Sequence, residues 1–125
     1  MGIQVVWDDE GHSIIRWEFQ ATWDWDDFQR ACDRSLDMAR SVDYRIDVIS
    51  YTSDTEKLPP GTLTHFKRVY DDHPENTHLI VITGGNVFVN SAIKMASRVY
   101  HIPSWRTAKT LEEARDTITQ DRQNG

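Results

Sequence analysis

The sequence has a single cysteine, Cys32, among its 125 residues. No disulfide can form within the chain, so the class of small secreted proteins held together by disulfides is excluded. Long apolar runs are also missing, because no stretch approaches the roughly 18 apolar residues that a membrane-spanning helix needs. The first twelve residues lack the basic and apolar regions of a signal peptide. We therefore expect a cytoplasmic protein without a membrane span.

Basic residues are in deficit. Lysine and arginine number 14 against 20 aspartate and glutamate residues, which gives a formal net charge of -6. An acidic surface repels the phosphate backbone of nucleic acids. The longest basic grouping, Lys67 and Arg68, is followed at once by Asp71 and Asp72. We therefore expect no nucleic-acid partner.

The length fits one domain, and we treat residues 1–125 as that domain because no repeat, linker or low-complexity segment divides them. Apolar and polar residues alternate over residues 3–7 and 14–19, which predicts two strands. The acidic turn between them contains Gly11, whose backbone freedom suits a hairpin.

A helix is expected next, capped by Thr22. Asp24, Asp26 and Asp27 would lie in its first turn, where carboxylates interact favourably with the helix dipole. This dipole role accounts for the three carboxylates without a catalytic function. A stripe at helical spacing predicts the buried face, with Cys32 as an inert core thiol; it consists of Trp25, Phe28, Cys32, Leu36 and Ala39.

Two further β-rich runs, residues 45–51 and 79–83, predict strands that we expect to be parallel and adjacent or nearly so. Helical patterns follow each of them, one opened by the prolines of residues 59–61 and the other over residues 87–100. A short strand at residues 105–108 and a helix with a capping box of Thr110 and Glu113 complete the chain. The order β-β-α-β-α-β-α-β-α predicts an α/β fold with a mixed sheet of four or five strands and packed helices.

The element order and length resemble the small stand-alone SpoIIAA-like proteins of the STAS group, as do the local sequences VVWDDEGHSIIRWEF, TWDWDDFQRA, RIDVISY, LPPG and LIVITGGNVFV. The fold of this group is related to the CRAL-TRIO lipid-transfer fold. The resemblance covers residues 3–118, and it implies a regulatory or binding module. The best-known members are phosphorylated on a serine at the start of the helix after the third strand. Here it implies Ser53 and Thr62 as candidate phosphorylation sites, although the family's short D-S-S/T-G-like motif is missing.

A candidate ligand or anion site lies where the strand at residues 79–83 turns into the next helix. Thr83, Gly84, Gly85 and Asn86 combine glycines that allow close approach with a helix N-terminus, and ligands bind beyond the carboxyl ends of strands in such sheets. The alternative is a tight connection in which Asn86 caps the helix. The residues match neither the dinucleotide nor the Walker pattern, so we expect no nucleotide cofactor.

The five histidines lack the spacing of metal ligands, and no pair stands four residues apart on a helix. We therefore expect neither a metal nor another cofactor. Trp7, Trp17, Trp23 and Trp25 lie early in the chain. Either they pack against one another, or they line a pocket between the hairpin and the first helix.

The predicted helix at residues 87–100 has apolar residues on two sides. We expect one side, formed by Phe88, Ala92, Met95, Ala96 and Val99, to face the sheet. The other side would then bind a protein partner or a second copy as a homodimer; it consists of Val89, Ile93 and Tyr100.

These patterns favour a non-enzymatic regulatory or binding module of the STAS type. The alternative is a carrier of a small apolar ligand or lipid, by analogy with the CRAL-TRIO relatives. A third class, a small hydrolase or transferase that uses the glycine loop, has the least support, because no catalytic constellation is evident in the sequence.

Overall fold

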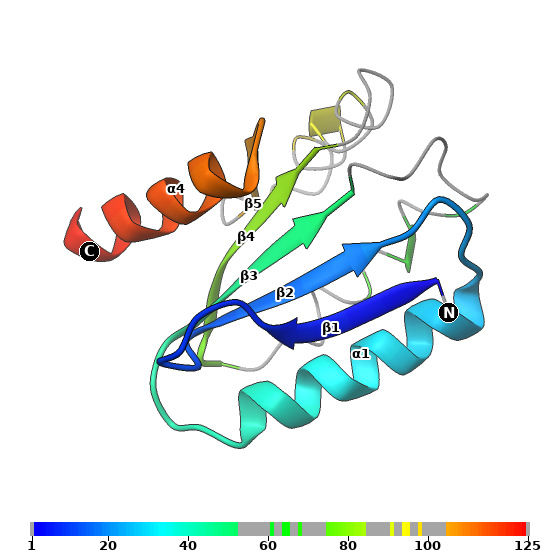
Figure 1. The fold of residues 1–125 in the computed structure, drawn as a ribbon, viewed down its shortest axis with the longest axis horizontal. Helices are drawn as coiled ribbons and strands as arrows, with labels where there is room; N and C mark the ends of the chain where they lie inside the picture. Colours follow the sequence, from blue (N-terminus) through cyan, green and yellow to red (C-terminus); the bar gives the residue numbers. More distant parts are fainter. Residues whose placement is uncertain are drawn as a thin grey trace.

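Five strands form one mixed sheet in the order β1-β2-β3-β4-β5 (Figure 1). The structure is a computed structural model that describes residues 2–52, 61, 64–65, 68, 75–84, 91, 94–95, 98 and 105–124. The strands are β1 (Ile3–Trp7), β2 (Ile14–Phe19), β3 (Ile46–Tyr51), β4 (Thr77–Thr83) and β5 (Trp105–Ala108). The helices with described bounds are α1 (Trp25–Arg40) and α4 (Leu111–Asn124).

The pairing of the strands confirms two predictions. β1 and β2 form an antiparallel hairpin in which Val5 lies opposite Trp17. β3 and β4 are parallel neighbours, and β2–β3 and β4–β5 are parallel pairs as well. The α/β class and the mixed sheet are therefore as the sequence indicates.

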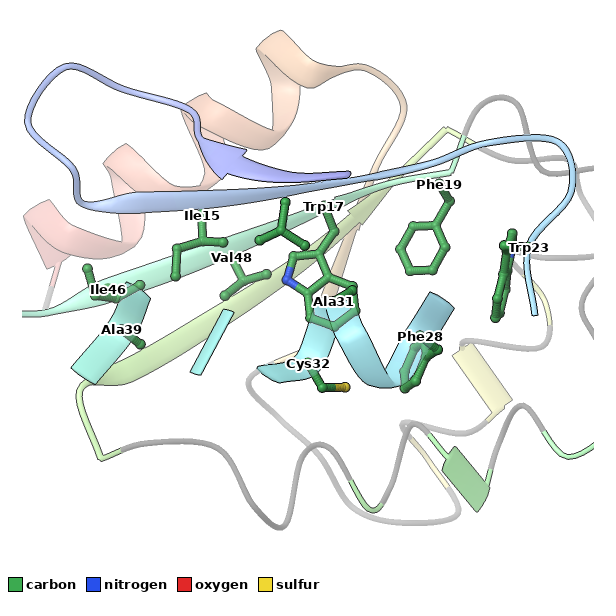
Figure 2. Packing of buried hydrophobic residues seen from close by; sticks show 11 residues of the cluster. Ile15, Trp17, Phe19, Trp23, Phe28, Ala31, Cys32, Ala39, Ile46 and Val48 are labelled. Atoms are coloured by element: carbon green, nitrogen blue, oxygen red, sulfur yellow. The ribbon is translucent and has the colours of Figure 1, made fainter. Parts of the chain in front are cut away.

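The two faces of the sheet are covered by different helices (Figure 1). Side chains alternate along each strand, so Ile15 and Trp17 face α1, whereas Ile14 faces α4. The core under α1 is aromatic and contains Phe19, Trp23 and Phe28 (Figure 2). The core under α4 is smaller and aliphatic; its buried members are Ile14, Ile49, Leu79, Val81, Ala108, Ala114 and Ile118.

The start of α1 differs from the prediction, because the N-cap is Asp24 and not Thr22. The carboxylate of Asp24 accepts a hydrogen bond from the backbone N–H of Asp27 at 2.8 Å, and the Asp27 carboxylate accepts one from the Asp24 N–H at 3.1 Å. This reciprocal capping box satisfies two N–H groups at once, which a threonine two residues earlier cannot do. Phe28, Cys32 and Ala39 of the expected stripe are buried, while Trp25 and Leu36 are half-buried.

The hairpin turn also differs in detail, since the residue with positive φ is His12, at 53°, rather than Gly11. The Asp9 side chain accepts hydrogen bonds from the N–H groups of Ser13 and Ile14, at 2.8 and 3.0 Å. The His12 ring stacks on Trp7 with the ring centroids 4.8 Å apart. These contacts hold the histidine in the left-handed conformation that glycine would otherwise adopt.

The assignment of Met95 to the side facing the sheet is wrong. Met95 has helical backbone and is 60% exposed. Ser91 and Arg98, four residues before it and three after it, are exposed as well and share its side of the helix. Their polarity draws this side toward water, and an apolar count alone does not reveal that orientation.

Few apolar contacts hold α4 on the sheet, and charged pairs supply the rest. Arg115 donates two hydrogen bonds to Asp8, at 2.9 and 2.8 Å, and Asp8 also pairs with Arg16 of β2. The expected cap of this helix is present, because Thr110 Oγ1 accepts from the Glu113 N–H at 3.1 Å. The Glu113 carboxylate, however, accepts a hydrogen bond from the backbone N–H of Lys109 and not from that of Thr110, so the reciprocal half of the capping box is shifted by one residue.

A second charged cluster anchors the C-terminal end of α4. Arg122 donates to Asp47 of β3 at 2.8 Å and to the carbonyl of Ser13 at 3.0 Å. Asp47 is fully buried and also accepts from Arg45, which in turn donates to Asp121 at 2.7 Å. α4 is therefore fixed at both ends by arginine–carboxylate pairs.

The Asp8 cluster predicts a pH dependence of stability. Hydrogen bonding from Arg115 holds the pKa of Asp8 below its usual value, with burial opposing this effect and Arg16 adding to it. A carboxylate whose pKa is lower in the folded state than in the unfolded state stabilises the fold when the pH is above the unfolded-state pKa of roughly 4. This stabilisation is lost as the pH falls through the folded-state pKa. We expect the free energy of unfolding to drop as pH falls below about 5. In Arg115→Gln we expect the drop to be about 1 kcal/mol smaller than in the wild type. The difference is modest because Arg115 is partly exposed and solvent weakens its pairing with Asp8.

Urea denaturation at a series of pH values measures this difference. Arg40→Gln is the matched control, because Arg40 is exposed at the end of α1, far along the chain from this cluster. The control should follow the wild type at every pH. A drop of equal size in wild type and Arg115→Gln would show that Arg115 does not tune Asp8.

Candidate functional site at the carboxyl edge of the sheet

The four parallel strands β2, β3, β4 and β5 end at the same edge of the sheet (Figure 1). Thr83, the last residue of β4, lies in register with Tyr51 of β3 on one side and with Ala108 of β5 on the other. Ligands in open α/β sheets bind beyond such carboxyl ends. The predicted residue Thr83 therefore stands in the middle of the edge where a ligand or partner is expected.

Two threonines join the ends of β3 and β4. The N–H and the hydroxyl of Thr52 both donate to the carbonyl oxygen of Thr83, at 2.8 and 3.0 Å. Thr52 is buried, and Thr83 is completely buried. The next residue, Gly84, has a φ of 78°, a value that glycine adopts without the steric cost of a side chain. The strand end is thus fixed up to the point where the chain turns.

The hydroxyl oxygen of Thr83 is buried and has no hydrogen-bond partner among the described residues. By strand alternation it lies on the same face as Leu79 and Val81, which is the face that α4 covers. A buried hydroxyl without a partner costs roughly 1–3 kcal/mol. Such a group is a candidate for a hydrogen bond to a ligand, a partner or an ordered water.

The other predicted site residues lie outside the described residues. This holds for Gly85 and Asn86 of the glycine turn and for the hydroxyl residues Ser53 and Thr62. The expected interface, formed by Val89, Ile93 and Tyr100, also lies outside them. The described structure thus places two of the four turn residues, Thr83 and Gly84, and the phosphorylation and interface assignments stay predictions.

The aromatic side chains near α1 pack against one another. Phe19 and Trp25 each lie with their ring centroids 5.2 Å from Trp23, in edge-to-face geometry, and Trp17 lies 5.6 Å from Phe28. Figure 2 shows the rings of Trp17, Phe19, Trp23 and Phe28 gathered between β2 and α1. This arrangement supports the interpretation of the tryptophans as mutual packing rather than as the lining of a pocket.

His65 extends this aromatic cluster, which the sequence did not indicate. Its ring stacks on Trp25 with the centroids 3.7 Å apart and the planes 10° from parallel. Arg68 lies 3.0 Å from Nδ1 of His65, and because arginine can only donate, Nδ1 is the acceptor. The His65 N–H bonds to the carbonyl of Gly61, so helical hydrogen bonding begins close to the expected prolines.

The thiol of Cys32 is buried, as predicted. Within the part of the chain that the structure describes, no three His, Cys, Asp or Glu side chains gather as a metal site would require. Among the described helices, none combines the length and the apolar character needed to cross a bilayer.

Two polar residues that bind several neighbours, Asp47 and Asn76, were not predicted from the sequence. Asp47 is the second residue of the central strand β3, and a charged residue in such an apolar strand indicates that a partner exists elsewhere in the chain. Asn76 gave no signal, yet its side-chain amide donates to the carbonyls of Ala39, Val42 and Tyr44 at 3.0, 3.3 and 3.0 Å. Both residues fix the amino ends of the parallel strands, opposite the candidate site.

Comparisons of the chain with protein-family models, with curated proteins and with solved structures found no match. The fold and the edge geometry therefore define a class only: an α/β protein with a five-stranded mixed sheet.

Proposed function

We propose that this protein is a non-enzymatic, cytoplasmic binding module of the STAS type that acts through contact with a protein partner at the carboxyl edge of its sheet. The observation that carries the proposal is the makeup of that edge. The hydroxyls of Thr52 and Thr83 lie buried at the ends of β3 and β4, next to the backbone of Gly84. These groups form hydrogen bonds but do not titrate near neutral pH, so they suit recognition better than acid–base chemistry.

The contrast between the two ends of the sheet supports the same proposal. At the amino ends, Asp47 and Asn76 are bound to several neighbours each. At the carboxyl ends, the buried Thr83 hydroxyl lacks a partner among the described residues. Polar groups with unmet hydrogen bonds concentrate at functional sites more than at purely structural ones.

Thr83→Val tests the proposal by separating stability from binding. Valine keeps the branched shape and removes the hydroxyl. Because that hydroxyl has no partner among the described residues, we expect the free energy of unfolding to stay the same or to rise by about 1 kcal/mol. We expect binding of the partner to weaken at least tenfold, which is about 1.4 kcal/mol.

The measurement is affinity capture from the source organism's lysate with the full chain as bait, followed by titration of the captured protein. Arg40→Gln is the matched control, because Arg40 is exposed at the C-terminal end of α1 and is not part of the carboxyl edge. This variant should capture the same protein as the wild type. Equal capture by Thr83→Val would contradict the proposed edge. A small apolar molecule retained in native mass spectrometry, without a protein partner, would favour the carrier function instead.

A further inference from the structure

Each buried carboxylate beneath α4 has two arginine partners of different origin. Asp8 pairs with Arg16 of β2 at 2.5 Å and with Arg115 of α4 at 2.8 Å. Asp47 pairs with Arg45, just before β3, at 3.0 Å and with Arg122 of α4 at 2.8 Å. In both clusters one arginine belongs to the sheet and the other to the helix that covers it.

This duplication gives each buried carboxylate an arginine partner that does not belong to α4. Removing one partner of a buried ion pair is usually strongly destabilising, because it leaves a buried charge uncompensated. Without α4, however, Asp8 keeps Arg16, and Asp47 keeps Arg45 together with the N–H of Leu79 at 2.9 Å. The side chains of Asp8 and Asp47 are 2% and 0% exposed, so this retained pairing prevents an uncompensated buried charge when the helix leaves.

The apolar contact of α4 is small for a helix of 14 residues. Ala114 and Ile118 are its buried residues, and Leu111 is partly buried against the same cluster. Arg115 and Arg122 are seven residues apart, so they project from one side of the helix about 10 Å from each other. The face of the sheet beneath α4 therefore binds a short helical pattern. Its aliphatic residues contact two apolar side chains of the helix, and its two carboxylates bind two arginines.

We propose that this face of the sheet is a docking site for an arginine-bearing amphipathic helix of a partner protein, and that α4 occupies it in the isolated chain. The partner helix carries apolar residues at the positions of Ala114 and Ile118 and arginines at those of Arg115 and Arg122. The net charge of -6 attracts such a basic helix. The proposal depends on the arginine–carboxylate pairs of α4 and not on the Thr83 hydroxyl, so its failure or success does not decide the function proposed at the carboxyl edge.

The experiment uses the full chain with a weakened resident helix, Arg115→Gln/Arg122→Gln, and a fluorescein-labelled peptide of residues 110–124 as the probe. The tethered α4 competes with the peptide at an effective concentration in the millimolar range, so the wild type should bind the peptide poorly. In fluorescence anisotropy we expect the double variant to bind at least tenfold tighter than the wild type. A peptide with both arginines replaced by glutamine should bind the double variant at least tenfold more weakly than the native peptide.

The matched control is Arg30→Gln/Arg40→Gln, which removes two exposed arginines from α1 and should bind the peptide no better than the wild type. Hydrogen exchange of the double variant supplies a second readout. We expect the α4 amides to exchange at least tenfold faster than in the wild type, while those of β3 and β4 stay protected.

Three results would overturn the proposal. Equal peptide binding by the wild type and the double variant would show that α4 does not occupy a site the peptide can use. Exchange in β3 and β4 that rises as much as in α4 would show that the helix cannot leave without unfolding. A dimer in sedimentation that the double variant forms and the wild type does not form would assign the face to a second copy rather than to a partner.

Discussion

Replacing Asp47 by alanine is expected to lower the free energy of unfolding by about 3 kcal/mol. The carboxylate is fully buried, accepts from the N–H of Leu79 and pairs with Arg45 and Arg122. Its removal leaves a buried N–H without a partner and two arginines facing each other without their shared anion. The two arginine side chains are 25% and 32% exposed, so water relieves part of the repulsion and the effect lies at the low end for a buried pair.

Urea denaturation at neutral pH measures this loss. Asp47→Asn keeps an acceptor for the Leu79 N–H and removes only the charge, so we expect an intermediate loss. Asp121→Ala is the matched control, because Asp121 binds the same Arg45 but is 41% exposed. Pairs of this kind contribute about 1 kcal/mol or less. If Asp47→Ala cost no more than Asp121→Ala, the buried cluster would not stabilise the fold.

The framework of the sheet could be predicted because it depends on local patterns. The alternation in β1 and β2 and the continuous apolar run in β4 follow from which faces are buried. Helix length and the buried Cys32 follow in the same way from helical spacing. The orientation of a helix is harder to predict from the sequence. The number of apolar residues in residues 87–100 did not show that Met95 faces water.

The polar clusters could not be predicted, since their partners are far apart in the chain. Arg122 lies 75 residues from Asp47, and Arg115 lies 107 residues from Asp8. Asn76 binds carbonyls more than 30 residues away, and an asparagine before a strand resembles an ordinary turn residue.

The candidate site was only partly predictable. Thr83 and Gly84 follow an apolar strand, which places them at the carboxyl edge by a general rule of open sheets. The pairing of Thr52 with the Thr83 carbonyl required the register between β3 and β4. That no described residue bonds to the Thr83 hydroxyl is a property of packing, and no residue pattern encodes it.

The second large effect is expected at Phe28, the α1 residue at the centre of the aromatic cluster. It is 3% exposed, and its ring centroid lies 5.6 Å from Trp17, 6.0 Å from Trp23 and 5.2 Å from Trp25. His65 completes the surroundings at 6.2 Å. Phe28→Ala removes a ring that four aromatic groups contact, so we expect the free energy of unfolding to fall by about 3–5 kcal/mol.

Phe28→Leu is the matched control, since it keeps most of the buried volume and loses only the ring geometry. We expect it to cost about 1.5 kcal/mol, and Phe28→Ala should in addition weaken the near-ultraviolet circular dichroism of the tryptophans that the ring holds in place. Urea denaturation and circular dichroism together decide the matter. A small loss for Phe28→Ala with an unchanged tryptophan signal would mean that the rings reach the same packing without it. That result would reopen the interpretation of this region as a pocket, because a cluster that tolerates the loss of its central ring has room for an apolar ligand.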